Sequence, residues 1–506
     1  MPDSEEVLRT VSLTKIYPDG TRALNNVDLD VARGEVHGLL GENGAGKTTL
    51  SKILSGILRP SSGEIYLKGK KVEIKHPKQA LELGVGMVHQ HFALVRPMTG
   101  FENAVLGTGI NPKGPRAESA RQQIIQLSKD VGLGIVGEAK VEDMALGAQQ
   151  RVEILKMLFR RVDVLILDEP TSSLTTTETV ELFKAVRRLK EEGKSAIFIT
   201  HKLREVTEIC DRITVLRRGE VTGRISSKDA DMKTLARMMV GRDVVFDLAR
   251  EPMHAGEKVL EVASLVVKGN RGEDAVRGVS LAVRKGEIFG IAGVEGNGQT
   301  ELEEVLSGLR KPLSGSVLLH GAEMAFATPS QIRKHSVGLI PEDRRQMGLI
   351  LEMSVGENAI LGKHRDARFR GAGMAIGWAK VRNFTLGLIK NFEIVVQGPD
   401  SPAKSMSGGN QQKVVVSREL CDDPEFILAA QPTRGLDIAA TEYIRKLLLK
   451  SRDSGKAVLL ISADLDEVLQ LSDTVGVMYE GRLIEVGPIE QMTRQRVGLL
   501  MGGVKA

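Results

Sequence analysis

Hydrophobic positions in the first half of the chain follow two patterns. A short apolar run occurs in EVHGLL (35–40), and solid apolar stretches that end in polar residues occur in VDVLILDEP (162–170) and SAIFITH (195–201). Solid runs of this length predict buried parallel strands, whose carboxyl ends carry the chemistry of α/β proteins. Apolar residues after the first run recur at the spacing of one helix face, at Leu50, Ile53, Leu54, Ile57 and Leu58. The pattern therefore predicts an α/β core.

The chain is duplicated. VDLDVARGEVHGLLGENGAGKTTL, from Val27, is matched by VSLAVRKGEIFGIAGVEGNGQTEL, from Val279, at an offset of 252. Further along, His201 matches Ala463 at an offset of 262, so about ten residues are inserted in the second copy. The boundary lies in an aperiodic segment that contains Pro and Gly. We therefore predict two domains, 1–245 and 259–506, joined by a linker at 246–258.

Composition narrows the protein class. Among the 506 residues, 42% are hydrophobic and 27% charged, which is an ordinary globular balance. A net charge of +5 spread over this length does not indicate nucleic-acid binding, so we expect no nucleic acid as a partner. Cys210 and Cys421 stand alone, so we expect neither disulfides nor a zinc cluster, and a reducing compartment. The acidic start and the lack of long apolar runs predict neither a signal peptide nor a membrane span.

A glycine-rich loop follows the first apolar run. It matches GxxxxGK[ST], in which backbone N–H groups surround phosphates and the lysine neutralises their charge. Such a turn alone is more often a plain turn, but the predicted strand before it and helix after it supply the required context. The candidate ATP-binding residues here are Gly41, Glu42, Asn43, Gly44, Ala45, Gly46, Lys47, Thr48 and Thr49.

Two further predicted strands end in candidate catalytic groups. Asp168 and Glu169 follow VLIL, and the sequence suggests Mg²⁺ held through water by the first and a general base in the second. An acidic pair at a strand end is often only a helix cap. His201 follows SAIFIT and is placed to contact a γ-phosphate, although a lone histidine there is more often structural. Their order after the glycine-rich loop favours catalysis.

This order of motifs resembles the ATP-binding-cassette (ABC) superfamily, and the resemblance covers nearly the whole chain, twice. It implies an α/β fold of two tandem ABC domains, each with a RecA-like parallel-sheet core, an antiparallel β portion and a helical subdomain. It also implies ATP and Mg²⁺ as cofactors. Tyr17 matches the aromatic residue that stacks on adenine, Gln90 the loop glutamine that senses Mg²⁺ and the transport partner, and His201 the switch histidine. The expected metal residues are Thr48, Gln90 and Asp168.

The second copy departs from this pattern. Its loop lacks the lysine, which costs roughly 10- to 150-fold in phosphate affinity, and its strand end lacks the base, which costs about 10² to 10⁴ in rate. We therefore expect this pocket not to hydrolyse ATP, whether or not it binds it. Glu342 stands where the first copy has Gln90, and Gly269 where it has Tyr17. The degenerate site comprises Gly293, Gly296, Gly298, Gln299, Thr300, Ala430, Gln431 and Ala463.

The resemblance implies that each ATP lies between the loop of one copy and an LSGGQ-like signature of the other. The second copy carries an almost intact signature, and Asp437 is its loop aspartate. The first copy has Ala145 in place of the signature serine and Thr175 in place of the aspartate. All the erosion thus falls on one composite site, which predicts one working ATPase site. The second-copy residues expected to complete it are Ser407, Gly408, Gly409, Asn410 and Asp437.

Fused cassettes with a weakened second half resemble the ATPase subunits of bacterial importers for monosaccharides and nucleosides. MVHQHFALV, IPEDRRQMGL, AGVEGNGQTEL and AAQPTRGLD look more like the nucleoside branch, whose receptor is a basic-membrane-protein-type lipoprotein. The resemblance implies two integral-membrane permeases and an extracytoplasmic substrate-binding lipoprotein as partners. It implies a peripheral place at the cytoplasmic face of the cell membrane and no direct contact with cargo.

Other functions remain open at this point. An importer ATPase for ribose, xylose or galactose would share the architecture. A soluble twin-cassette translation factor would usually have a long charged linker and both catalytic glutamates, and this chain has neither. A scaffold without turnover is disfavoured by Glu169 and His201. Trp378 is expected to pack in a core, and Arg344 and Arg345 to be solvated, with contact to a permease loop as the alternative.

Overall fold

The computed structural model describes residues 6–89, 92–134, 138–144, 146–171, 174, 176–243, 250, 253–270, 272–371 and 375–504. Contacts divide the chain into a first unit, Met1–Val244, and a second unit, Val245–Ala506. Part of the predicted linker 246–258 lies outside the described residues.

The first unit contains two sheets. A six-stranded sheet has the order β10-β9-β3-β8-β7-β6, parallel except for β10, and an antiparallel sheet has the order β2-β1-β4-β5. The three predicted strands are β3, β8 and β7, which are adjacent and buried along their whole length, so their carboxyl ends share one edge. The strands are β1 (Glu6–Ile16), β2 (Arg22–Ala32), β3 (Val36–Gly41), β4 (Ser62–Leu67), β5 (Lys70–Val72), β6 (Val85–Val88), β7 (Val164–Asp168), β8 (Ser195–Thr200), β9 (Arg212–Arg217) and β10 (Glu220–Ser226).

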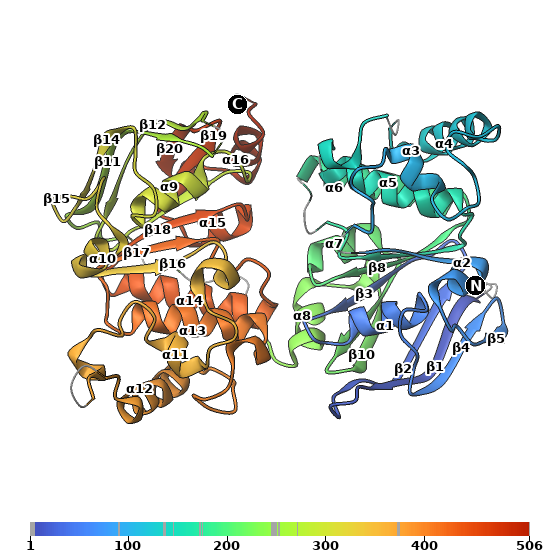
Figure 1. The fold of residues 1–506 in the computed structure, drawn as a ribbon, viewed down its shortest axis with the longest axis horizontal. Helices are drawn as coiled ribbons and strands as arrows, with labels where there is room; N and C mark the ends of the chain where they lie inside the picture. Colours follow the sequence, from blue (N-terminus) through green and yellow to red (C-terminus); the bar gives the residue numbers. More distant parts are fainter. Residues whose placement is uncertain are drawn as a thin grey trace. The chain divides into compact units, whose positions relative to one another are not determined.

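Helices connect the strands of the first unit, and α3, α4 and α5 pack on one another as a helical subdomain (Figure 1). The helices are α1 (Lys47–Leu54), α2 (Pro77–Glu82), α3 (Gly100–Val105), α4 (Ala117–Val131), α5 (Leu146–Phe159), α6 (Thr176–Glu191), α7 (Leu203–Ile209) and α8 (Met232–Val240).

The helix after the glycine-rich loop is shorter than the sequence pattern predicts. Helix α1 ends at Leu54, and Ile57, which was expected on its buried face, is 43% exposed. Gly56 adopts a φ of 75°, and a Cβ there would lie 2.7 Å from the backbone of His76. The chain turns away at this glycine because the approaching segment leaves no room for a further helical turn with a side chain.

The second unit repeats the topology of the first. Its sheets have the orders β16-β17-β18-β13-β19-β20 and β12-β11-β14-β15, with the same parallel and antiparallel pairings. The strands are β11 (Lys258–Lys268), β12 (Asp274–Arg284), β13 (Ile288–Ala292), β14 (Ser314–Leu319), β15 (Ala322–Glu323), β16 (Val337–Ile340), β17 (Phe426–Ala430), β18 (Ala457–Ser462), β19 (Thr474–Tyr479) and β20 (Arg482–Pro488). The α/β class predicted from the sequence is confirmed.

The helices of the second unit follow the same order, and a π-helical turn, η4 (Arg344–Gly348), precedes its helical subdomain. The helices are α9 (Gln299–Leu306), α10 (Pro329–Ile332), α11 (Val355–Ala359), α12 (Trp378–Asn391), α13 (Gly408–Leu420), α14 (Ile438–Asp453), α15 (Leu465–Leu471) and α16 (Arg494–Met501). Trp378 begins α12 and is 54% exposed, so the expectation that it packs in a core is wrong.

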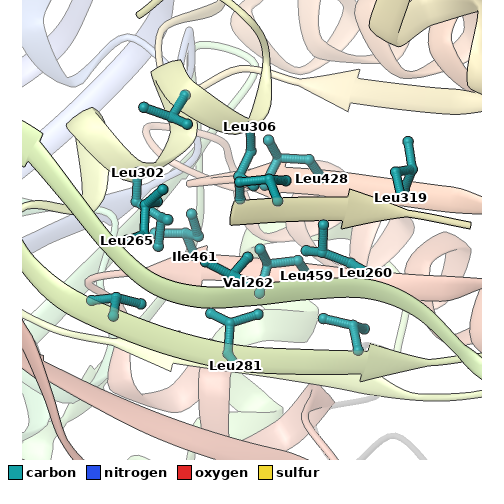
Figure 2. Close-up of a cluster of buried hydrophobic side chains, with 14 of the residues drawn as sticks. Leu260, Val262, Leu265, Leu281, Leu302, Leu306, Leu319, Leu428, Leu459 and Ile461 are labelled. Carbon is teal, nitrogen blue, oxygen red and sulfur yellow. The ribbon is translucent and has the colours of Figure 1, made fainter. Parts of the chain in front are cut away.

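The largest core of the second unit lies between its two sheets. Figure 2 shows Leu302 and Leu306 of α9 among side chains of both sheets, including Leu260 of β11 and Leu428 of β17. In the first unit α1 contributes Leu50, Ile53 and Leu54 to the equivalent core. Because the helix is packed from both sides, the glycine-rich loop at its N-terminus is fixed against the strand edge.

Within the described residues, no helix combines the length and the apolar character needed to cross a lipid bilayer.

Candidate nucleotide-binding site

The glycine-rich loop of the first unit joins β3 to α1. Gly46 caps α1 with a φ of 106°, and a Cβ there would lie 2.6 Å from the carbonyl oxygen of Ala23. Only glycine permits this left-handed turn so close to β2. The turn directs the first backbone N–H groups of α1 toward the strand edge, which is the arrangement that binds phosphate.

Lys47 is the first residue of α1 and is buried. Its Nζ donates hydrogen bonds to the carbonyl oxygens of Gly41, at 2.7 Å, and Glu42, at 3.0 Å. Burial lowers the pKa of Lys47, while the charges of Glu169 and Asp168 act in the opposite direction. The ammonium group is thus held over the loop by neutral acceptors, where a phosphate would provide a stronger, charge-assisted partner.

Asp168 ends β7 and is 3% exposed. Its Oδ2 accepts a hydrogen bond of 3.3 Å from the hydroxyl of Ser51, on the second turn of α1. Burial raises the pKa of Asp168, and the neighbouring charge of Glu169 adds to the rise. The carboxylate therefore lacks sufficient positive charge around it, which suits a group that holds a metal ion.

Glu169 follows directly, with a φ of 47°, and its N–H donates to the carbonyl oxygen of Ile199 at 2.9 Å. Its Oε1 lies 3.0 Å from Nδ1 of His201, which follows β8. Burial opposes ionisation of Glu169, but the hydrogen bond and charge of His201 and the charge of Lys47 outweigh it and lower the pKa. Glu169 is therefore an ionised carboxylate, fixed by a left-handed turn and an imidazole.

Among the other predicted residues of this site, Tyr17 lies within the described part of the chain. The hydroxyl of Tyr17 lies 3.3 Å from that of Thr49, so the aromatic ring stands beside the start of α1. Gln90 lies outside the described residues, as do Ala145 and Thr175 of the eroded first-copy motifs. Within the described chain no three His, Cys, Asp or Glu side chains are arranged to hold a metal. The hard oxygens of Asp168 and exposed Thr48 nevertheless fit Mg²⁺, which takes few protein ligands beside phosphate oxygens.

The second unit keeps the backbone of the site without its chemistry. Gly298 has a φ of 101°, and a Cβ there would lie 2.2 Å from the carbonyl oxygen of Ala275, as at Gly46. Gln299 takes the place of Lys47, and its Nε2 donates to the carbonyl oxygen of Val294 at 3.2 Å. The fold therefore preserves the loop while the phosphate-binding charge is absent from it.

In the second unit, the side chain at one catalytic position accepts a hydrogen bond from the backbone of the other. Gln431 has a φ of 45°, close to that of Glu169, and its N–H donates to the carbonyl oxygen of Ile461 at 2.7 Å. Its Oε1 accepts a hydrogen bond of 3.2 Å from the N–H of Ala463. An amide cannot act as a general base at neutral pH, and Ala463 provides no imidazole.

The signature of the second unit begins α13. The Ser407 hydroxyl caps this helix and accepts a 3.0 Å hydrogen bond from Nδ2 of Asn410. Asp437 caps α14 through a 2.8 Å hydrogen bond from the N–H of Ala440. Its Oδ2 lies 3.5 Å from the point where a Cβ on Gly409 would stand. The structure thus brings Ser407, Gly409 and Asp437 to one place.

Arg344 is a neighbour of this signature that the sequence did not indicate. It was expected to be solvated, but its guanidinium is partly buried and would lie 2.7 Å from a Cβ on Gly408. Its Nη1 donates to the carbonyl oxygen of Arg434 at 2.8 Å, and burial lowers its pKa. Arg345 is exposed, as expected. Only the π-helical turn η4, a tertiary feature, brings Arg344 to the start of α13.

Comparisons with known proteins agree with this geometry. The model of the ABC transporter family matches residues 24–172 and 276–434. The nucleoside import ATP-binding protein NupA of Lactococcus lactis subsp. cremoris is 44% identical over 502 residues, or 99% of each chain. The guanosine import ATP-binding protein NupO of Bacillus subtilis is 43% identical, over 99% of this chain and 98% of that one. The glucose import ATP-binding protein TsgD13 of Haloferax volcanii is 42% identical, over 99% and 96%.

One solved structure, the ADP conformation of an ATP-binding cassette of an ABC transporter, is 24% identical. The match covers 47% of this chain and 99% of that one, with a TM-score of 0.43.

The duplicated fold and the phosphate loops define a twin nucleotide-binding cassette. The family match covers more than half of the chain, in both copies. The chain therefore belongs to the ABC transporter family, and the predictions of an ABC ATPase and of its twin-cassette fold are confirmed.

Proposed function

We propose that this chain is the motor subunit of a nucleoside importer, in which ATP is hydrolysed at the first unit only. The observation that carries the proposal is the contrast between Glu169 beside His201 and Gln431 beside Ala463. The same backbone is present in both units, but only the first has an ionised carboxylate and an imidazole at the strand edge. Turnover needs the first pair and cannot use the second.

The glycine-rich loop of the first unit is the ATP site in this proposal. Residues Gly41 to Thr49 surround the phosphates, Lys47 exchanges its loop carbonyl partners for phosphate oxygens, and Tyr17 stacks on adenine. Thr48, Gln90 and, through water, Asp168 hold Mg²⁺. The ion supplies positive charge to the phosphate oxygens when bound.

Glu169 accepts the proton of the attacking water. His201 orients this carboxylate from one side, and in this proposal it contacts the γ-phosphate. The lowered pKa of Glu169 keeps it ionised and ready to accept a hydrogen bond from water.

We propose that the signature of the second unit completes this ATP site. Ser407, Gly408, Gly409, Asn410 and Asp437 supply a hydroxyl and backbone N–H groups at a helix start, which suit a γ-phosphate. Support comes from the sequence, because the intact loop and the intact signature are in different copies. ATP binding then closes the two copies, and hydrolysis reopens them.

The partners and the cargo are proposed from the relatives. Two integral-membrane permeases would hold this subunit at the cytoplasmic face, and a lipoprotein receptor would deliver the cargo outside. The names of two relatives, NupA and NupO, favour a nucleoside. The glucose importer relative, at 42%, keeps a monosaccharide as the second candidate.

A deletion strain tests the cargo. Uptake of labelled nucleosides is expected to fail and to return with the wild-type gene but not with Glu169→Gln, while uptake of labelled ribose, xylose and galactose stays normal. Lost sugar uptake with normal nucleoside uptake would overturn the nucleoside assignment alone. Co-purification with ribosomes and no membrane permease would overturn the importer proposal.

A further inference from the structure

The second unit carries a buried carboxylate that the first unit lacks. Position 303 corresponds to Ser51, at the offset of 252, and position 430 corresponds to Asp168, at the offset of 262. In the first unit the Ser51 hydroxyl supports the Asp168 carboxylate. In the second unit Glu303 replaces the serine and Ala430 replaces the aspartate, so the acid has moved from the strand end to the facing helix.

Glu303 is 4% exposed and lies in a pocket with other acidic residues. The pocket is lined by Glu295, Gln299, Thr300, Glu303, Glu342, Ala430, Gln431 and Ile461. The N–H of Glu342 donates to Oε1 of Glu303 at 3.3 Å, and the Thr300 hydroxyl donates to Oε2 of Glu342 at 3.1 Å. Side-chain oxygen atoms from α9 and from the segment after β16 therefore line the same cavity.

The positive charge near this pocket is at its rim. Arg434 pairs with Glu342, at 2.7 Å, and with Glu295, at 2.9 Å. Burial raises the pKa of Glu303 to about 7. The hydrogen bond from the Glu342 N–H opposes this rise, and the charge of Glu342 adds to it. Arg434 pairs with Glu342 and Glu295, and among the described residues no ion pair reaches the Glu303 carboxylate, in a pocket that has Gln299 where the first unit has its phosphate-binding lysine.

Gln299 provides an independent indication of a ligand. It is 8% exposed and lines the same pocket. Its Oε1 is buried without a hydrogen-bond partner among the described residues. Because Nε2 donates to the carbonyl oxygen of Val294, the unpartnered atom is the acceptor. A buried acceptor in the same pocket as the buried Glu303 carboxylate calls for a cation or a donor.

We propose that Glu303, Glu342, Thr300 and Gln299 bind a hard divalent cation of the Mg²⁺ class in the second unit without any nucleotide. Two carboxylates, a hydroxyl and an amide carbonyl are the oxygen ligands that such ions take, with waters filling the remaining positions. The cation would also give this pocket the positive charge that Gln299 cannot provide. Nucleotide binding in the second unit would then require the metal. The site stands whether or not the chain imports nucleosides.

Mn²⁺ binding to the full-length, nucleotide-free protein tests the site, read by electron paramagnetic resonance. Asp168→Ala removes the metal-holding acid of the first unit, so the Mn²⁺ that this variant still binds without nucleotide is assigned to the second unit, and such binding is expected. Glu303→Gln keeps the shape and an acceptor for the Glu342 N–H while it removes the charge. This substitution should weaken the binding of Mn²⁺. The affinity should fall at least by the roughly 10- to 100-fold that the loss of a supporting partner costs a metal site. Mg²⁺ should compete with Mn²⁺, and stronger competition by Ca²⁺ would contradict the Mg²⁺ class.

Glu303→Ser serves as the second variant, because Ser51 shows that serine is accepted at the equivalent position. This variant should lose Mn²⁺ binding as Glu303→Gln does. Its melting temperature, measured in the presence of a metal chelator, should equal that of the wild type. Gln299→Lys should also displace Mn²⁺, because an ammonium group would occupy the pocket. Equal Mn²⁺ affinity in wild type and Glu303→Gln, or loss of binding in Asp168→Ala alone, would overturn the proposal.

Discussion

Nδ1 of His201 lies 3.0 Å from Oε1 of Glu169, and the two residues directly follow neighbouring parallel strands, β8 and β7. The imidazole and the charge of Lys47 lower the pKa of Glu169 against the effect of burial. An ionised, oriented carboxylate at the edge where a phosphate loop begins can accept a proton from water. The corresponding side chains of the second unit cannot.

Glu169→Gln is therefore expected to keep ATP binding and to lower the rate of hydrolysis by about 10² to 10⁴. The amide retains the size of the side chain and loses only the basic oxygen. The matched control is Gln431→Ala, which should leave the rate within about twofold, the variation expected of a group outside the reaction. Filter binding of labelled ATP and phosphate release measure the two quantities. A similar loss of rate in both variants would contradict a single working site.

Lys47→Ala should abolish ATP binding at the working site, or weaken it at least by the roughly 10- to 150-fold that one charge-assisted contact provides. Its Nζ now donates to two loop carbonyls, which places the ammonium group directly at the phosphate-binding loop. Gln299→Ala is the control, because the second loop already lacks this charge. Binding isotherms for ATP should separate the variants, and comparable losses would show that the assignment of the sites is wrong.

The sequence predicted the first-unit site because its residues follow strands in fixed local motifs. GxxxxGK[ST] and Asp168-Glu169 need only a strand edge to come together. It could not predict Arg344 beside the signature, since that contact depends on a π-helical turn and on the packing of α13. It also placed Ile57 on the first helix, because apolar spacing continues past Gly56, where close approach of another segment ends the helix.

Glu303 was missed for a different reason. Taken alone, a glutamate on an amphipathic helix predicts a solvated face. The signal appears only when the copies are compared position by position, because Ser51 becomes Glu303 where Asp168 becomes Ala430. The burial of Glu303 depends on tertiary packing, which the sequence does not show. Because Glu303 is buried, the loss of the acid at Ala430 is interpreted as a shift of the acid to α9 and not as decay of the site.

Ser407→Ala tests whether the second-unit signature serves the first-unit site. We expect strongly reduced hydrolysis, because the γ-phosphate would lose its contacts with the Ser407 hydroxyl and with the ordered start of α13. The substitution also removes a helix cap, worth about 0.5–2 kcal/mol. Thr493→Ala removes the equivalent cap of α16, away from the signature, and controls for that cost. Ala145→Ser should change little, since it restores a serine toward the second-unit pocket, which has Gln299, Ala430 and Gln431 where the first unit has Lys47, Asp168 and Glu169. Activity gained there would contradict the pairing.

A buried glutamate stands at the same position in both units, as Glu35 in the first and Glu287 in the second. Glu35 is bound by Arg212, with Nε at 2.8 Å from Oε1, and by His37 at 2.9 Å. Burial opposes its ionisation, but the hydrogen bonds from His37 and Arg212 prevail and lower the pKa to about 2. Its counterpart Glu287 has Thr474 in place of Arg212, and burial raises its pKa.

The two shifts predict opposite effects on stability. The contribution of Glu35 is present above its unfolded pKa, near 4.5, and is lost as the pH falls through about 2. Glu35→Gln should therefore destabilise the first unit on the order of 2 kcal/mol at pH 7, and less as the pH falls from 4.5 toward 2. Glu287 has the raised pKa, so its charged form is penalised in the folded state above that pKa. Glu287→Gln should be neutral or stabilising at pH 7. Calorimetric melting at pH 7 and pH 3 measures both variants, and equal destabilisation at pH 7 would contradict the roles assigned to Arg212 and His37.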